Sequence, residues 1–181
     1  LCSPNTTTQT FNMKNTQVFR GSPTWHPILL ASDEEKLRAY ADPAVRRKLH
    51  DEMVEWKVEI PGGTISREWY NYIWVEEVKL DKNRGLVGKT LKQVADMKGQ
   101  RIIDAFLDLV VEEKLETTFM QAENNIDVEA MKAILNYPNA LIGLSDGGAH
   151  VQYHGGYGFS TRLLGEWARE QQIMSLENAV R

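Results

Sequence analysis

The chain has 181 residues, of which 42% are hydrophobic and 25% charged, and its formal net charge is −4. This balance is typical of an ordinary soluble globular protein, and the mixed charges give no basic face that would predict nucleic-acid binding. No apolar run approaches the roughly 20 residues of a membrane span, and no signal-peptide pattern opens the chain. One cysteine, Cys2, excludes an internal disulfide and favours a reducing, cytoplasmic compartment.

Both ends of the sequence look cut. It begins at Leu1 without a methionine, and residues 175–181 have the pattern of a helix that is just beginning. A complete eight-stranded α/β barrel typically needs about 250 residues, so this chain is short for one. We therefore expect a piece of a longer protein.

Two helices are predicted in the first third of the chain, after residues 1–24, which show little periodicity and are expected to be irregular. Ser32 is a good N-cap for a helix that ends near Ala41. The next helix has Pro43 in its first turn and an apolar residue at every fourth position. His50 lies among the polar positions of this helix, so we expect a solvated surface histidine.

The middle of the chain predicts a strand and two further helices. Aromatic residues occupy every second position over 70–75, which is strand periodicity. Thr90 opens a capping-box pattern for a helix that closes at Gly99. The helix over about 101–114 has a broad apolar face, and we assign that face to the core.

The last third predicts a strand, a helix and a second strand. Residues 117–120 can form the first strand, Asp127 caps a helix that Pro138 ends, and the apolar run 140–144 forms the second strand. A βαβ unit of this length implies two parallel strands with a right-handed crossover. A further amphipathic helix is expected around residues 163–168.

The most informative stretch is residues 140–150, where the apolar run stops at Ser145 and Asp146 and two glycines follow. An acid at the carboxyl end of a buried strand, before a flexible loop, is where α/β enzymes tend to keep catalytic groups. The alternative is that Asp146 only caps the next turn, as aspartate often does at such corners. His150 follows closely and makes the catalytic interpretation worth testing.

The last 95 or so residues resemble the closing part of an amidohydrolase-superfamily barrel, with the N-acyl-D-amino-acid deacylases as the nearest family. The stretches that carry this resemblance are VGKT at 87–90, DAFLDL at 104–109, LIGLSDGGAH at 141–150 and LLGEW at 163–167. The resemblance implies an α/β fold in which residues 87–181 form the last strands and helices of a partial TIM-type (β/α) barrel. Residues 1–86 would then be an N-terminal α+β insertion.

The resemblance also implies a role for Asp146, as a ligand of a metal ion, usually zinc, and as the group that moves the proton of the attacking water. A carboxylate beside a divalent cation stays ionised, so it can serve first as general base and then as general acid. The substrate would be a small N-acylated amino acid. The family's other ligands are histidines at earlier strand ends, and none of the four histidines here shows the His-x-His pair of the first strand. We therefore predict that the isolated chain does not hydrolyse amides.

Two further residues are candidates for substrate binding. The family tends to carry a His-Pro-Arg signature after the aspartate, and that signature is absent here, which leaves D-amino-acid specificity open. Arg162 can take over the binding of an anionic group, or it can be an ordinary surface arginine. His150 can line the pocket or hydrogen-bond Asp146, or it can be structural.

Two other functions compete with hydrolysis. The glycines of 147–148 and 155–158 can form backbone nests that bind an anion before a helix. Alternatively, the chain is a non-catalytic barrel remnant that serves as a binding or assembly module. A half-barrel exposes sheet edges and helix faces, so we expect association with the missing barrel half or with copies of itself.

Overall fold

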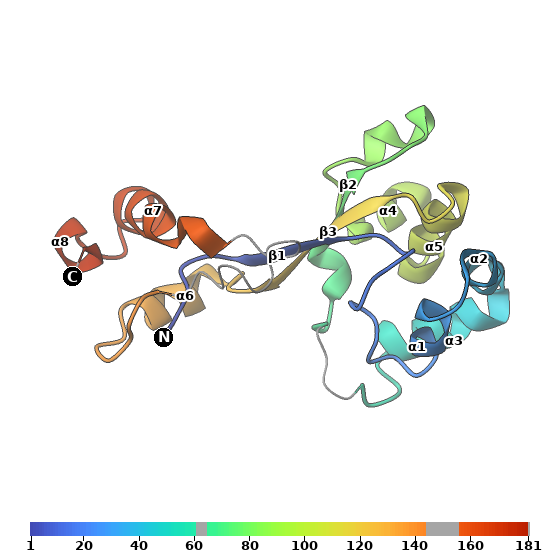
Figure 1. Cartoon of the computed structure of the whole chain (residues 1–181), viewed down its shortest axis with the longest axis horizontal. Coiled ribbons are helices and arrows are strands. Elements are labelled where there is room, and N and C mark those ends of the chain that lie inside the picture. The colour runs from blue at the N-terminus through green and yellow to red at the C-terminus, as the bar shows by residue number, and fades with distance from the viewer. Residues whose placement is uncertain (61–64, 144–155, 181) are drawn as a thin grey trace. The chain divides into compact units, whose positions relative to one another are not determined.

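The computed structural model describes residues 1–60, 65–143 and 156–180 (Figure 1). It is a mixed α/β structure with one small sheet and many helices. The strands are β1 (Thr7–Phe11), β2 (Ile73–Glu77) and β3 (Thr118–Asn124). The helices are α1 (Trp25–Leu29), α2 (Asp33–Ala41), α3 (Pro43–Met53), α4 (Leu91–Lys98), α5 (Ile102–Glu112), α6 (Val128–Leu135), α7 (Phe159–Arg162) and α8 (Leu176–Ala179). Among the helices of these ranges, none is long and apolar enough to span a bilayer.

The chain divides into two compact units. Unit 1 consists of residues 1–9 and 122–181, and unit 2 of residues 10–121. The structure thus keeps residues 87–121 with the residues before them, whereas the sequence suggested a boundary between residues 86 and 87. That residues 1–86 form an insertion stays a prediction.

The sheet has the strand order β1-β3-β2. β2 and β3 are antiparallel, with Trp74 opposite Met120 and Val75 opposite Phe119. The prediction that residues 1–24 are irregular is wrong for β1, whose sequence Thr-Thr-Gln-Thr-Phe is rich in β-branched residues that suit a strand.

The core of unit 2 is an aromatic cluster beneath α5. The rings of Phe19 and Trp25 stack with centroids 4.0 Å apart, and Phe106 meets Phe119 edge-on at 5.1 Å. Phe106 projects from α5, and all four side chains are buried. This confirms the prediction that the apolar face of this helix is part of the core.

The predicted helix starts are confirmed by their caps. Ser32 and Thr90 each form a complete capping box with the residue three positions on, and Asp127 accepts a hydrogen bond from the backbone of Ala130. Gly99 ends α4 with a φ of 62°, a left-handed conformation that favours glycine. The prediction for His50 is wrong in part, because its side chain is only 18% exposed and pairs with Glu55.

Unit 1 has a small core between α6 and the helical segment that follows α7. Its fully buried members are Met131 and Leu135 of α6 together with Leu163 and Trp167. The expected parallel pairing of residues 117–120 with 140–144 is absent from the described residues, because β3 already has β1 and β2 as its neighbours. The described part of that second strand pairs elsewhere, with Cys2.

Candidate functional site

The predicted catalytic and metal-binding residue, Asp146, and the predicted pocket residue His150 lie in residues 144–155, outside the described residues. The structure does describe the chain on both sides of this segment, at residues 140–143 and from residue 156 onward. The structure therefore describes the candidate site through these two flanks and the residues that contact them.

The entry to the segment is a short extended stretch centred on Ile142. Ile142 forms an isolated parallel bridge with Cys2. The backbone N–H of Cys2 donates to the oxygen of Leu141 at 2.9 Å, and that of Gly143 donates to the oxygen of Cys2 at 2.9 Å. The side chain of Ile142 packs against the core of unit 1. The chain therefore approaches Asp146 as a short extended segment, and the prediction of a buried strand is wrong for its described part, because Ile142 forms only an isolated bridge and Leu141 is 70% exposed.

Residues 3–6, which continue from Cys2, are fixed by side chains rather than by a strand. The amide nitrogen of Asn125 donates to the carbonyl oxygens of Ser3 at 3.1 Å and Asn5 at 2.8 Å. The hydroxyl of Thr6 donates in return to the Asn125 carbonyl at 3.2 Å. Asn125 has a φ of 58°, in the left-handed region that asparagine tolerates better than most residues. The side chain of Asn125 thus supplies hydrogen bonds to this backbone that a neighbouring strand would otherwise supply.

The chain leaves the segment through three successive helix types. A 3-10 turn, Gly156–Gly158, leads into one α-helical turn, α7, which is followed directly by a π-helical segment, Leu163–Glu170. π-helical turns are rare and occur often at functional sites. Leu163 and Trp167 of this segment are buried in the core of unit 1.

Arg162, the predicted anion-binding residue, lies at the junction between α7 and the π-helical segment. Its guanidinium holds the Glu166 carboxylate in a two-pronged contact, with Nε–Oε2 at 2.6 Å and Nη2–Oε1 at 3.1 Å. Nη2 also donates a hydrogen bond to the hydroxyl oxygen of Thr6 at 3.3 Å. Because a carboxylate already occupies this fork, an external anion would have to compete with Glu166. A role for Arg162 in substrate binding stays a prediction.

Sequence reasoning missed Glu166, Thr6 and Asn125 as partners in this region. The spacing of Arg162 and Glu166, four residues apart on a helix, was a signal that could have revealed the ion pair. No local pattern predicts the contacts of Asn125 with residues more than a hundred positions earlier.

The described residues do not assemble a donor set for a metal ion. Within the described ranges, no three His, Cys, Asp or Glu side chains come together in a group that could hold a metal. His26 lies beside the carbonyl of Arg20 and His50 beside Glu55, both in unit 2.

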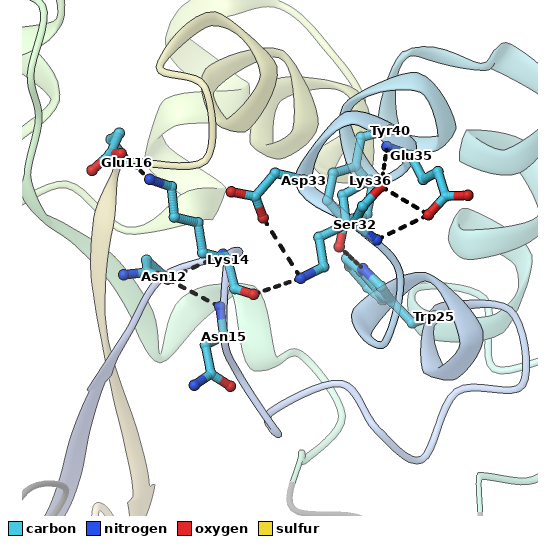
Figure 2. Close-up of polar contacts among 10 residues, drawn as sticks. All are labelled: Asn12, Lys14, Asn15, Trp25, Ser32, Asp33, Glu35, Lys36, Tyr40 and Glu116. Carbon is cyan, nitrogen blue, oxygen red and sulfur yellow. Dashed lines mark hydrogen bonds and ion pairs between the residues drawn. The ribbon is translucent and has the colours of Figure 1, made fainter.

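A second polar cluster, in unit 2, has a structural explanation (Figure 2). Lys36 of α2 is buried, and its Nζ donates to the carbonyl oxygen of Lys14 at 2.5 Å, with Asp33 4.0 Å away. Lys14 itself pairs with Glu116, and the hydrogen bond between them raises the pKa of Lys14 and lowers that of Glu116. Each charged group here has a partner, so the cluster ties the loop after β1 to α2 and offers no free group for catalysis.

Comparison with known proteins yields relatives without an assigned activity. The chain is 28% identical over 148 residues to uncharacterized proteins of Mycobacterium bovis and Mycobacterium tuberculosis. The match covers 77% of this chain and 23% of each relative, so the chain spans about a quarter of the length of the relatives it matches. No family model matches the sequence, and no solved structure matches it.

Proposed function

We propose that this chain is part of a metal-dependent hydrolase of amide C–N bonds, with small N-acylated amino acids as substrates, and that Asp146 is its catalytic residue. The observation that carries the proposal is the sequence Ser-Asp-Gly-Gly three residues beyond Ile142, a partly buried residue in a parallel bridge. Helices precede and follow this stretch, as in the repeating unit of a (β/α) barrel. In this proposal the chain contributes the last strands of such a barrel.

The chemistry required of Asp146 is proton transfer. As a water molecule attacks the carbonyl carbon of the amide, a carboxylate oxygen of Asp146 accepts a proton from that water. The same oxygen returns the proton to the amide nitrogen as the C–N bond breaks, which releases a carboxylic acid and an amine. A bound zinc ion would acidify the water and polarise the carbonyl group. A catalytic zinc ion takes about three protein ligands, so the others would come from polypeptide outside these 181 residues.

The test is hydrolysis of a panel of N-acetylated L- and D-amino acids by the natural polypeptide that carries this sequence, with release of the free amine as the readout. We expect zinc-dependent turnover that falls by at least about a thousandfold in Asp146→Asn, because the carboxylate can no longer accept the proton. Asp96→Asn is the matched control, since Asp96 is an exposed carboxylate on α4 that pairs with Lys92. The 181-residue chain alone should be inactive.

Two results would contradict the proposal. Turnover that survives in Asp146→Asn would remove Asp146 from the reaction. No turnover of any amide, combined with stabilisation of the chain by phosphate in thermal unfolding, would favour an anion-binding domain instead.

A further inference from the structure

The hydrogen bonds of residues 2–6 reach both sides of the segment 144–155, which contains the proposed catalytic aspartate. On the entry side, the backbone of Cys2 pairs with Leu141 and Gly143. Gly143 is the last described residue before the segment. Cys2 therefore sets the backbone position at which the chain enters the segment.

On the exit side, two side chains hold the same stretch. The indole Nε1–H of Trp167 donates to the carbonyl oxygen of Pro4 at 2.8 Å in a buried position. The guanidinium of Arg162 donates to the hydroxyl oxygen of Thr6 at 3.3 Å. Buried hydrogen bonds and those from a charged donor are stronger than exposed neutral ones, so these contacts fix residues 4–6 to the helix that follows the segment.

Asn125 holds the same residues from the turn between β3 and α6. Carbonyl oxygens two residues apart in an extended strand are about 7 Å apart, which is too far for one nitrogen to bind both. The chain bends at residues 4 and 5, and the carbonyl oxygens of Ser3 and Asn5 come within 3.1 Å and 2.8 Å of the single Asn125 amide nitrogen. An amide NH₂ has two hydrogens, one for each oxygen. The amide of Asn125 therefore fixes this bend.

The backbone of Asn125 is as specific as its side chain. Its φ of 58° lies in the left-handed region, which glycine and asparagine adopt at the lowest cost. Its carbonyl oxygen accepts a hydrogen bond from the Thr6 hydroxyl at 3.2 Å. Glycine is therefore the substitution that removes the amide without straining the backbone.

We propose that Asn125 is a positioning residue for the proposed hydrolysis. Its amide fixes residues 3–5, and residues 2–6 in turn hold the entry and exit flanks of the segment that contains Asp146. The inference rests on the proposed function, because it assigns Asn125 a role in that reaction. A displacement of about 1 Å can slow a reaction by about a hundredfold. The expected loss is therefore in kcat rather than in KM.

The first test is the hydrolysis of N-acetylated amino acids by the natural polypeptide with saturating zinc. Asn125→Gly should lower kcat by about ten- to a hundredfold and leave KM within about threefold. Asn125→Asp should lose at least as much, because a carboxylate has no hydrogen to donate and repels the two carbonyl oxygens. Asn136→Asp is the matched control, since the amide of Asn136 also donates to a carbonyl oxygen in unit 1, that of Lys132 at 2.9 Å.

The second test is amide hydrogen exchange of the same polypeptide, which needs no turnover. In Asn125→Gly the amides of Cys2 and Gly143 should exchange at least about tenfold faster, because the stretch that holds the entry flank is released. The amides of Met131 and Leu135 in α6 should change by less than about threefold, which separates a local release from unfolding of unit 1 as a whole.

A second variant keeps the inference testable if Asn125→Gly does not fold. Thr6→Val keeps the branched shape of the side chain and removes the hydrogen bonds of the hydroxyl with Asn125 and Arg162. Because the amide of Asn125 stays in place, both measurements should change in the same direction as in Asn125→Gly, by a smaller factor.

Three results would count against this role. Turnover by the wild type with an unchanged kcat in Asn125→Gly overturns the inference and leaves the proposed function standing. Exchange that accelerates equally at Gly143, Met131 and Leu135 also overturns it, since Asn125 would then only stabilise unit 1. A wild type that hydrolyses no amide overturns the proposed function and the role in catalysis with it, and unchanged exchange at Gly143 would then show that Asn125 does not hold the flanks either.

Discussion

The indole Nε1–H of Trp167 donates a hydrogen bond to the carbonyl oxygen of Pro4 at 2.8 Å in a buried position. Cys2, two residues before Pro4, holds the chain on the other side of residues 144–155 through its bonds with Leu141 and Gly143. The two flanks of the segment that contains Asp146 are thus fixed to the same short stretch of chain, residues 2–6. The geometry of the candidate site depends on this stretch.

Trp167→Phe should destabilise unit 1 by about 1–2 kcal/mol, because the buried Pro4 carbonyl loses its donor while most of the ring packing stays. The measurement is amide hydrogen exchange, in which the amides of Cys2 and Gly143 should exchange faster. Trp56→Phe, in unit 2, is the control and should leave these two amides unchanged. Unchanged protection in Trp167→Phe would show that residues 2–6 are held without this bond.

Local signals predicted the helices well because caps and helical periodicity lie within a few residues of each other. Ser32, Thr90 and Asp127 each cap a helix where the sequence predicted one. Strand pairing was harder to predict from the sequence. The partner of Ile142 is Cys2, 140 positions away, and no local pattern indicates that these two residues pair. The βαβ prediction assumed that neighbouring elements in sequence pair in space, and β3 pairs with β1 and β2 instead.

For the candidate site, the sequence provided the residue types but not their surroundings. Arg162 was identified as a possible anion-binding residue, whereas its occupation by Glu166 and its contact with Thr6 emerged only from the structure. The role of Asp146 still depends on the sequence resemblance and on the strand-like approach through Ile142.

Glu113→Gln should destabilise unit 2 by about 2–3 kcal/mol, since hydrogen bonds to a charged acceptor are strong and this carboxylate is buried. It accepts hydrogen bonds from the backbone N–H groups of Lys79 at 2.5 Å and Leu80 at 3.1 Å, and from the side-chain amide of Asn83 at 2.6 Å. Urea unfolding measures the loss. Glu112→Gln, next to it and one-third exposed, should cost less than about 1 kcal/mol. Equal effects of the two variants would contradict this account.

Asp108 should make the free energy of unfolding depend on pH under acidic conditions. Burial acts to raise the pKa of Asp108, but hydrogen bonds from Arg46 at 2.6 Å and Gln100 at 2.8 Å outweigh it and lower the pKa below the ordinary 3.8. A folded-state pKa below the unfolded one means that the stabilisation is present above pH 3.8 and is lost as the pH falls through the lower value.

Arg46→Gln should therefore flatten the stability profile at and below pH 3.8. The side chain of Asp108 is 39% exposed, so solvent screening keeps the effect below about 1 kcal/mol. Thermal unfolding from pH 2.5 to 6, chosen to bracket about one to two units around this pKa, measures it. Lys92→Gln, which removes an exposed partner of Asp96, should leave the profile as it is. A profile in Arg46→Gln that keeps the original acid slope would contradict the assignment to Asp108.

The metal content of the protein tests most directly whether Asp146 belongs to a hydrolytic centre. Elemental analysis of the natural polypeptide, purified without chelators, should find stoichiometric zinc that is lost in Asp146→Ala and retained in the exposed-carboxylate control Asp96→Ala. A protein that binds no zinc, or one that keeps its zinc in Asp146→Ala, would contradict the assignment.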